Sequence, residues 1–151
     1  MTSTFKKKVY AACVALLDER ISSFQELLRD LTDGAENDSK SSAGDKHETS
    51  RAMMQLEHEK ISRQLDETIR QRNELEKILP GQAQEVISKG SLIKTNQGYL
   101  FLSVAIGKII EDETSVIVLS PQSPLGINLA GRKRGDTVEM NRVQYKILEV
   151  Q

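Results

Sequence analysis

Six carboxylates gather in one short stretch of the sequence, and they are the side chains best suited to chemistry. Carboxylate oxygens on a loop could hold Mg²⁺ through one or two ligands, the usual mode for this ion, or could bind a basic groove of a partner. The competing interpretation is structural, because Asp45 and Glu48 have capping-box spacing and acidic residues favour a helix N-terminus. Only Lys40 and Lys46 oppose the acids in this stretch. The six are Asp30, Asp33, Glu36, Asp38, Asp45 and Glu48.

Histidine and cysteine do not form a recognisable site. His47 and His58 lack His-Glu-x-x-His spacing, and one cysteine cannot supply a zinc-finger ligand set. We expect His58 to be a packing or polar register residue on the face between two helices. Cys13 falls on an apolar helix face, which favours packing over a reactive thiol. A single cysteine forms no internal disulfide and is typical of a reducing compartment.

Two long helical segments flank the acidic stretch and would position it. A seven-residue apolar repeat without Pro predicts a helix from about Thr4 to Glu36, roughly 45–50 Å long. The small polar segment from Asn37 to Gly44 predicts a loop. The apolar rows are Tyr10, Leu17, Phe24 and Leu31, then Cys13, Arg20 and Leu27, then Val14, Ile21, Leu28 and Ala35.

A second helix is predicted from Asp45 to Leu79, where Pro80-Gly81 would end it. Two helices of similar length joined by a short loop run antiparallel and bury their apolar stripes against each other. The sequence therefore predicts a coiled-coil hairpin over residues 1–80, with an acidic tip at about 37–48. The rows of the second helix are Met54, Ile61, Thr68 and Leu75, and His58, Leu65, Arg72 and Leu79.

The pattern changes to short strands from Gly90 onward. An Asn96-Gln97-Gly98 turn between two apolar runs is a hairpin signal, and a short helix is expected over Ser123–Ala130. Residues 81–151 are therefore expected to form a compact antiparallel sheet with one small helix, which makes the chain α+β. The predicted strands are Ser91–Thr95, Tyr99–Val104, Val116–Leu119, Thr137–Met140 and Gln144–Val150.

Composition narrows the possible functions. The net charge of −1 gives no global argument for a nucleic-acid or membrane partner. No apolar run approaches the roughly 18 residues of a membrane span, and a soluble cytoplasmic protein is expected. Aromatic residues are only 4% and Trp is absent, which argues against a large aromatic-lined pocket. The basic run Arg132-Lys133-Arg134 could be a docking patch for an acidic partner or a solvated turn.

Two motifs carry a family resemblance. The first is Gly44-Asp45-Lys46-His47-Glu48 at the tip. The second runs from Ser123-Pro124-Leu125 through Arg132-Lys133-Arg134-Gly135-Asp136, and the closing Tyr145–Val150 strand agrees with it. In this order, with the hairpin first, the chain resembles the GreA/GreB family of bacterial transcript-cleavage factors over nearly its whole length.

The resemblance implies a concrete function. The C-terminal domain would be FKBP-like and would dock on RNA polymerase through Ser123, Pro124 and Leu125. The hairpin would enter the secondary channel, where Asp45 and Glu48 would help hold a Mg²⁺ shared with the polymerase and assist cleavage at the nascent RNA 3′ end. The protein would be a monomer without a cofactor, and it would stimulate the polymerase's own RNA cleavage without being an enzyme itself.

Other functions stay open beside this one. Thr49 and Ala52 stand where the family usually has Asn and Tyr, so a regulator that binds the channel without stimulating cleavage is an alternative. A hairpin chaperone or prolyl isomerase would need an aromatic pocket, for which the β region offers only three residues. A coiled-coil dimerisation module is disfavoured by the polar side chains on the inward rows. The three aromatic residues are Tyr99, Phe101 and Tyr145, and the inward polar residues are Arg20, Thr68 and Arg72.

Overall fold

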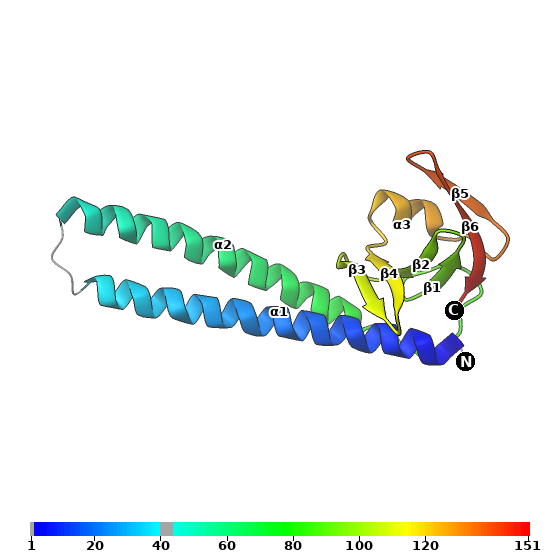
Figure 1. Ribbon diagram of the computed structural model, residues 1–151, viewed down its shortest axis with the longest axis horizontal. Helices are drawn as coiled ribbons and strands as arrows, with labels where there is room; N and C mark the ends of the chain where they lie inside the picture. Colours follow the sequence, from blue (N-terminus) through cyan, green and yellow to red (C-terminus); the bar gives the residue numbers. More distant parts are fainter. Residues whose placement is uncertain (1, 40–43) are drawn as a thin grey trace. The chain divides into compact units, whose positions relative to one another are not determined.

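Two long helices and a six-stranded sheet make up the computed structural model (Figure 1). The structure describes the backbone of residues 2–39 and 44–151, and the side chains of residues 4–34 and 48–151. None of the helices in this described part combines the length and apolar character that crossing a membrane requires.

The contacts divide the chain into two compact units. One unit joins residues 1–15 to residues 73–151, and the other contains residues 16–72. Both long helices run through both units, so the sheet shares its unit with the first turns of one helix and the last turn of the other. A division into domains at residue 80 stays a prediction.

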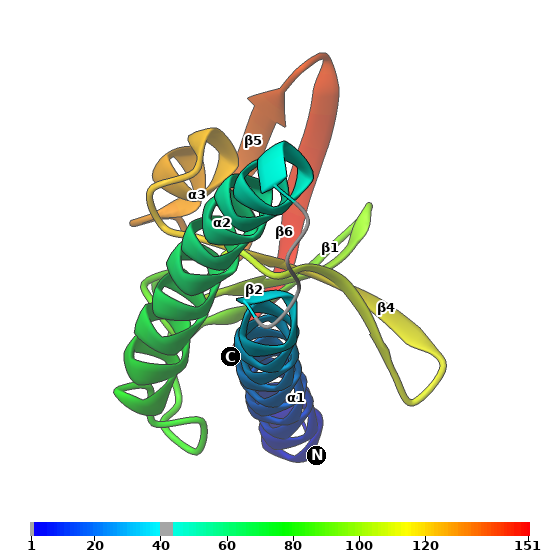
Figure 2. The same ribbon diagram turned by 90° about the vertical axis from the view of Figure 1, so that its left-hand side faces the viewer.

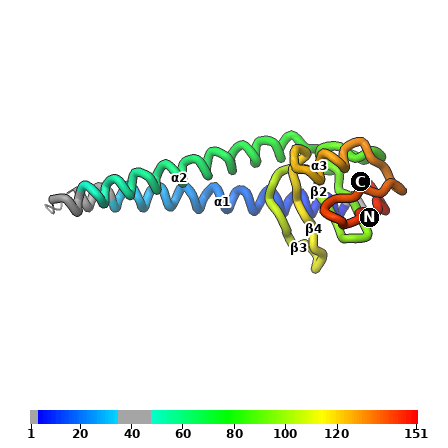
Figure 3. The backbone as a smooth tube through the Cα atoms, turned by 90° about the horizontal axis from the view of Figure 1, so that it is seen from above, coloured from blue at the N-terminus to red at the C-terminus, as the bar shows by residue number. Residues whose placement is uncertain are grey.

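The second unit is an antiparallel helical pair, as predicted. Helix α1 spans Thr2–Ser39 and helix α2 spans Gly44–Glu76. The two lie side by side and run in opposite directions (Figures 1 and 3). Leu17, Ile61 and Thr68 are buried, which confirms the inward rows that contain them.

Some positions assigned to the apolar rows are exposed instead. Leu27 is 47% exposed and His58 is also exposed, so neither packs between the helices as predicted. A helix that contacts a single partner buries only a narrow stripe, and positions at the edge of that stripe stay in solvent. Two of the three inward polar residues have partners: Arg72 Nε donates to Asp18 Oδ1 at 2.8 Å, and Thr68 Oγ1 donates to the Gln64 carbonyl at 2.7 Å.

The helix ends differ from the predicted ones. Helix α1 continues to Ser39, so residues 37–39 are helical where a loop was expected. Helix α2 ends at Glu76, three residues before the predicted end, and Leu79 is 66% exposed. The chain then leaves the helix through a turn in which Ile78 N donates to the Leu75 carbonyl at 3.0 Å. Lys77 N likewise bonds to the Glu74 carbonyl at 3.3 Å, so the last turn closes through bonds to the carbonyl three residues back, a common way for a helix to end.

The sheet has the strand order β3-β4-β2-β1-β6-β5, so β3 and β5 are its edge strands. Figure 2 shows β4, which pairs with β3, and β5 on different sides of the strands between them. Four of the five strand pairings are antiparallel, but β2 and β4 pair in parallel, so the expected wholly antiparallel sheet is wrong at this point. The strands are β1 Leu92–Thr95, β2 Gly98–Leu102, β3 Gly107–Glu111, β4 Thr114–Leu119, β5 Thr137–Met140 and β6 Val143–Val150.

Strand β3 was not predicted. It forms a hairpin with β4 through Asp112 and Glu113, whose φ angles are 50° and 60°. These angles are those of a type I′ turn, which usually carries Asn or Gly. The turn therefore lacks the residues by which such hairpins are recognised. Hairpin β1–β2 was predicted correctly, since Thr95 pairs with Gly98 across the two-residue turn.

Each face of the sheet is covered by a helix. On one face Leu129 of helix α3 (Pro124–Leu129) packs with strand residues such as Leu100, Leu102 and Ile147. On the other face the first turns of α1 supply Phe5, whose ring centroid lies 5.1 Å from that of Tyr99. Burial of apolar surface on both faces holds these helix turns and the sheet together as one unit.

Candidate functional site

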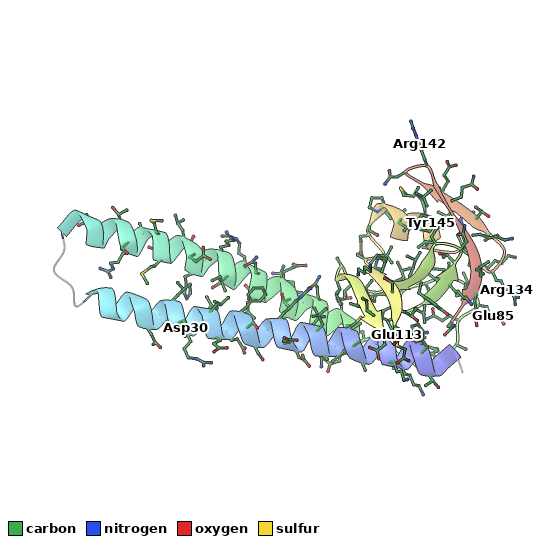
Figure 4. All side chains as sticks on the ribbon, viewed as in Figure 1. Asp30, Glu85, Glu113, Arg134, Arg142 and Tyr145 are labelled. Carbon is green, nitrogen blue, oxygen red and sulfur yellow. The ribbon has the colours of Figure 1, made fainter. Side chains whose placement is uncertain are left out.

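The acidic tip is described in part. Asp30, Asp33 and Glu48 have exposed side chains (Asp30 is labelled in Figure 4). The side chains of Glu36, Asp38, Asp45 and His47 lie outside the described residues. Helix α2 begins at Gly44, so Asp45 lies inside its first turn and is not the residue that precedes the helix, as a cap would be. A carboxylate in a first turn still interacts favourably with the helix dipole.

The donor set at the tip fits Mg²⁺ only as a partial site. Asp45 and Glu48 are three positions apart on α2, and residues at this spacing share one face of a helix. Two carboxylates suit an ion that binds few protein oxygens and takes its other ligands from water or phosphate. Within the described side chains no group of three or more His, Cys, Asp or Glu residues could hold a metal.

A groove of about 250 Å³ lies between the helices behind the tip. His58 stands on its rim, with Nδ1 3.5 Å from Ser62 Oγ. The helices approach closely here, because a Cβ on Gly34 would lie 3.0 Å from Met54 Cε. The groove is lined by Leu31, Thr32, Arg51, Met54, Gln55 and His58.

The Ser123-Pro124 motif builds the start of α3. Ser123 Oγ donates to the Ser120 carbonyl at 2.6 Å and accepts from Gly126 N at 3.1 Å, which makes it the N-cap. Pro124 takes the first helical position, where its missing N–H costs nothing. A Cβ on Gly126 would overlap the Ser120 carbonyl oxygen. The residues of the motif are therefore explained by the loop conformation that they stabilise, whether or not a partner binds there.

In this conformation the three predicted contact residues differ in exposure and bonding, and their docking role stays a prediction. The Ser123 hydroxyl is occupied within the loop, and Leu125 packs against the core. Pro124 is exposed. Ile127, which sequence reasoning missed, is 62% exposed one turn further along α3. The spacing of the sequence could have predicted this exposure. Leu125 and Leu129 are four residues apart and share one face of the helix, whereas Pro124 and Ile127 are three apart and share another.

The basic run lies in the turn between α3 and β5. Lys133 N donates to Asp136 Oδ2 at 3.0 Å, and Gly135 N donates to the Ile147 carbonyl at 2.8 Å. The side chains of Arg132, Lys133 and Arg134 are exposed. The backbone is thus an ordered turn whose cations face solvent, and a docking role stays a prediction.

Another exposed arginine, Arg142, lies at the end of the β5–β6 hairpin (Figure 4).

The aromatic residues of the β region are used in packing. Phe101 is fully buried, Tyr99 contacts Phe5, and Tyr145 packs against the core. The aromatic side chains that a prolyl isomerase pocket would need are therefore used in packing.

The chain was compared with protein-family models, curated proteins and solved structures. No protein-family model matches the chain, and no curated protein matches it. Among solved structures, the chain is similar to one described as the structure of the transcription factor Gfh1, at 18% sequence identity and a TM-score of 0.37. The match covers 91% of this chain and 92% of that one.

Proposed function

We propose that this protein is a transcription factor that binds RNA polymerase and inserts its helical tip into the secondary channel to stimulate cleavage of backtracked RNA. The observation that carries the proposal is the position of Asp45 and Glu48 in the opening turns of α2, within an antiparallel helical pair. The Ser123-Pro124 loop on the same chain supports it, because both motifs resemble those of GreA/GreB factors.

The chemistry follows from what two carboxylates can do. Asp45 and Glu48 would bind and orient a Mg²⁺ whose remaining ligands come from the polymerase, from RNA phosphate and from water. Mg²⁺ in a two-metal arrangement supplies an activated water and stabilises the charge of phosphodiester hydrolysis. Because two carboxylates are an incomplete metal site, the chain would support cleavage only when bound to the polymerase. We propose that it binds as a monomer and acts in the cytoplasm.

A second candidate is a regulator that occupies the channel without stimulating cleavage. The observation that favours it is the pair Thr49 and Ala52, which stand on α2 where the related family usually has Asn and Tyr. Such a protein would share the hairpin and the docking loop, and would differ only in the reaction at the tip.

Binding to core RNA polymerase tests the part that both candidates share. We expect the full chain to bind with micromolar or tighter affinity, and Ile127→Asp to weaken binding about tenfold, because an exposed apolar contact at the centre of an interface would be lost. Val143→Asp is the matched control, since Val143 is a partly exposed aliphatic residue on β6. A wild-type chain that fails to bind polymerase from its own organism would rule out both candidates.

A further inference from the structure

A second groove lies between the helices of the 16–72 unit. It is a wide, shallow groove of about 450 Å³ that is largely open to solvent. Both helices contribute to it, with two residues from α1 and five from α2. The lining residues are Arg20, Phe24, Lys60, Arg63, Gln64, Glu67 and Thr68.

The rim of this groove is cationic. Arg20 approaches from α1, and Lys60 and Arg63 approach from α2. The single carboxylate in the lining, Glu67, lies 3.7 Å from Arg70 outside the groove. Three cations against one partly neutralised acid favour an anionic ligand, in a protein whose overall charge is slightly negative.

The floor of the groove differs chemically from its rim. Phe24 is half-buried there, and Thr68 is buried with its hydroxyl donated to the Gln64 carbonyl of its own helix. The floor thus presents an aromatic ring and a threonine whose hydroxyl is already bonded. A ligand that fits both parts carries negative charge at one end and a flat apolar surface at the other.

We propose that this groove binds a nucleoside di- or triphosphate, with its phosphates on Arg20, Lys60 and Arg63 and its base on Phe24. Arginine binds phosphate oxygens through paired hydrogen bonds, and nucleobases stack on aromatic side chains. A single nucleotide is favoured over a nucleic-acid strand because the cations converge on one groove, whereas strand binding needs a basic track along several nucleotides. The proposal does not depend on the polymerase role.

Titration calorimetry of the full chain tests it, with ATP, tripolyphosphate, adenosine and a ten-nucleotide oligoadenylate as probes. We expect saturable binding of ATP to one site, about tenfold weaker binding of tripolyphosphate and no measurable binding of adenosine. Lack of saturation by ATP at about 5 mM would overturn the proposal. So would oligoadenylate binding that ATP does not displace, because that result indicates a strand site.

Variants locate the site. The double variant Lys60→Gln/Arg63→Gln should weaken ATP binding at least about tenfold, whereas Arg51→Gln, at an exposed arginine on the same helix that does not line this groove, should leave it unchanged. Phe24→Leu should weaken ATP but not tripolyphosphate, and the retained tripolyphosphate binding shows that the helical pair is folded. Equal losses in Arg51→Gln and in the double variant would contradict a defined site.

Discussion

At Gly126 the backbone of the α3 loop leaves no room for a side chain. A Cβ there would overlap the Ser120 carbonyl oxygen and lie 2.9 Å from Ser123 Oγ. We predict that Gly126→Ala lowers the free energy of unfolding by about 2–4 kcal/mol, because backbone has to move. Urea denaturation measures this, with Gly81→Ala as control, since a Cβ on Gly81 would meet only the flexible Lys7 side chain at 3.4 Å. Equal losses in the two variants would contradict the steric argument.

Lys6 is a second residue whose environment makes a prediction. Its side chain is 1% exposed and Nζ donates to the Gln82 carbonyl at 3.1 Å. Burial lowers the pKa of Lys6 below 10.5. Between this lowered pKa and 10.5 the unfolded chain binds more protons than the folded one, so this group makes the free energy of unfolding rise with pH.

Replacing Lys6 by Met should remove that alkaline rise. At neutral pH the variant should be more stable by on the order of 1 kcal/mol, because no buried charge has to be desolvated. Lys8→Met is the control with the opposite sign: its ion pair with Asp112, at 3.0 Å, raises the pKa of Lys8, so that contribution is lost as pH rises. Urea denaturation at several pH values on both sides of pH 10.5 measures both slopes, because the Lys6 contribution changes below this value and the Lys8 contribution above it. If the free energy of unfolding of Lys6→Met still rises with pH in this range, a group other than Lys6 causes the rise.

At the scale of elements, the sequence predicted the two helices better than it predicted which strands pair. The seven-residue apolar repeat was enough to predict both helices, because the pattern of a helix face recurs within a few residues of the chain. Strand β3 was missed because Lys108-Ile109-Ile110 is short and its turn lacks Gly. The parallel pairing of β2 with β4 could not be predicted, because alternation shows which face of a strand is buried and not which strand lies beside it.

The packing of the helical pair can be tested at Ile61, which is 5% exposed on α2. We predict that Ile61→Ala destabilises the helical pair by about 2–4 kcal/mol, because apolar contacts are lost and a cavity is left. Ile69→Ala, at a site 36% exposed on the same helix, should cost about 1 kcal/mol or less. Circular dichroism at 222 nm during urea unfolding follows the loss of helix. A larger effect at Ile69 would contradict the predicted inward row.

At the scale of the whole molecule, α1 belongs to both compact units. Its first turns belong to the same unit as the sheet. Cys13, in this part of the helix, is fully buried, and burial raises the pKa of the thiol to about 12. We predict that Cys13 does not react with a thiol reagent in the native protein at pH ~8, because a protonated, buried thiol is a poor nucleophile. One thiol per chain should react in denaturant. Rapid native labelling would mean that the first turns of α1 leave the sheet.

The candidate site was predictable only in part. The Ser123-Pro124 motif pointed to the right loop, but its hydrogen bonds and the exposure of Ile127 depend on how α3 packs on the sheet. Asp45 and Glu48 were selected because they are three residues apart, a spacing expected both at a helix N-terminus and in a two-carboxylate metal site. Sequence reasoning therefore could not separate the stabilisation of α2 from chemistry at its first turn.

Transcript cleavage by stalled, backtracked RNA polymerase from the same organism tests the central claim most directly. The wild-type chain should release short 3′ RNA fragments, and Asp45→Ala or Glu48→Ala should slow their release at least about a hundredfold while polymerase binding is retained, because each removes a metal ligand. Asp30→Ala, an exposed acid on α1, should cleave like the wild type. Absence of fragments despite binding, or cleavage unaffected by both tip variants, would contradict the cleavage mechanism.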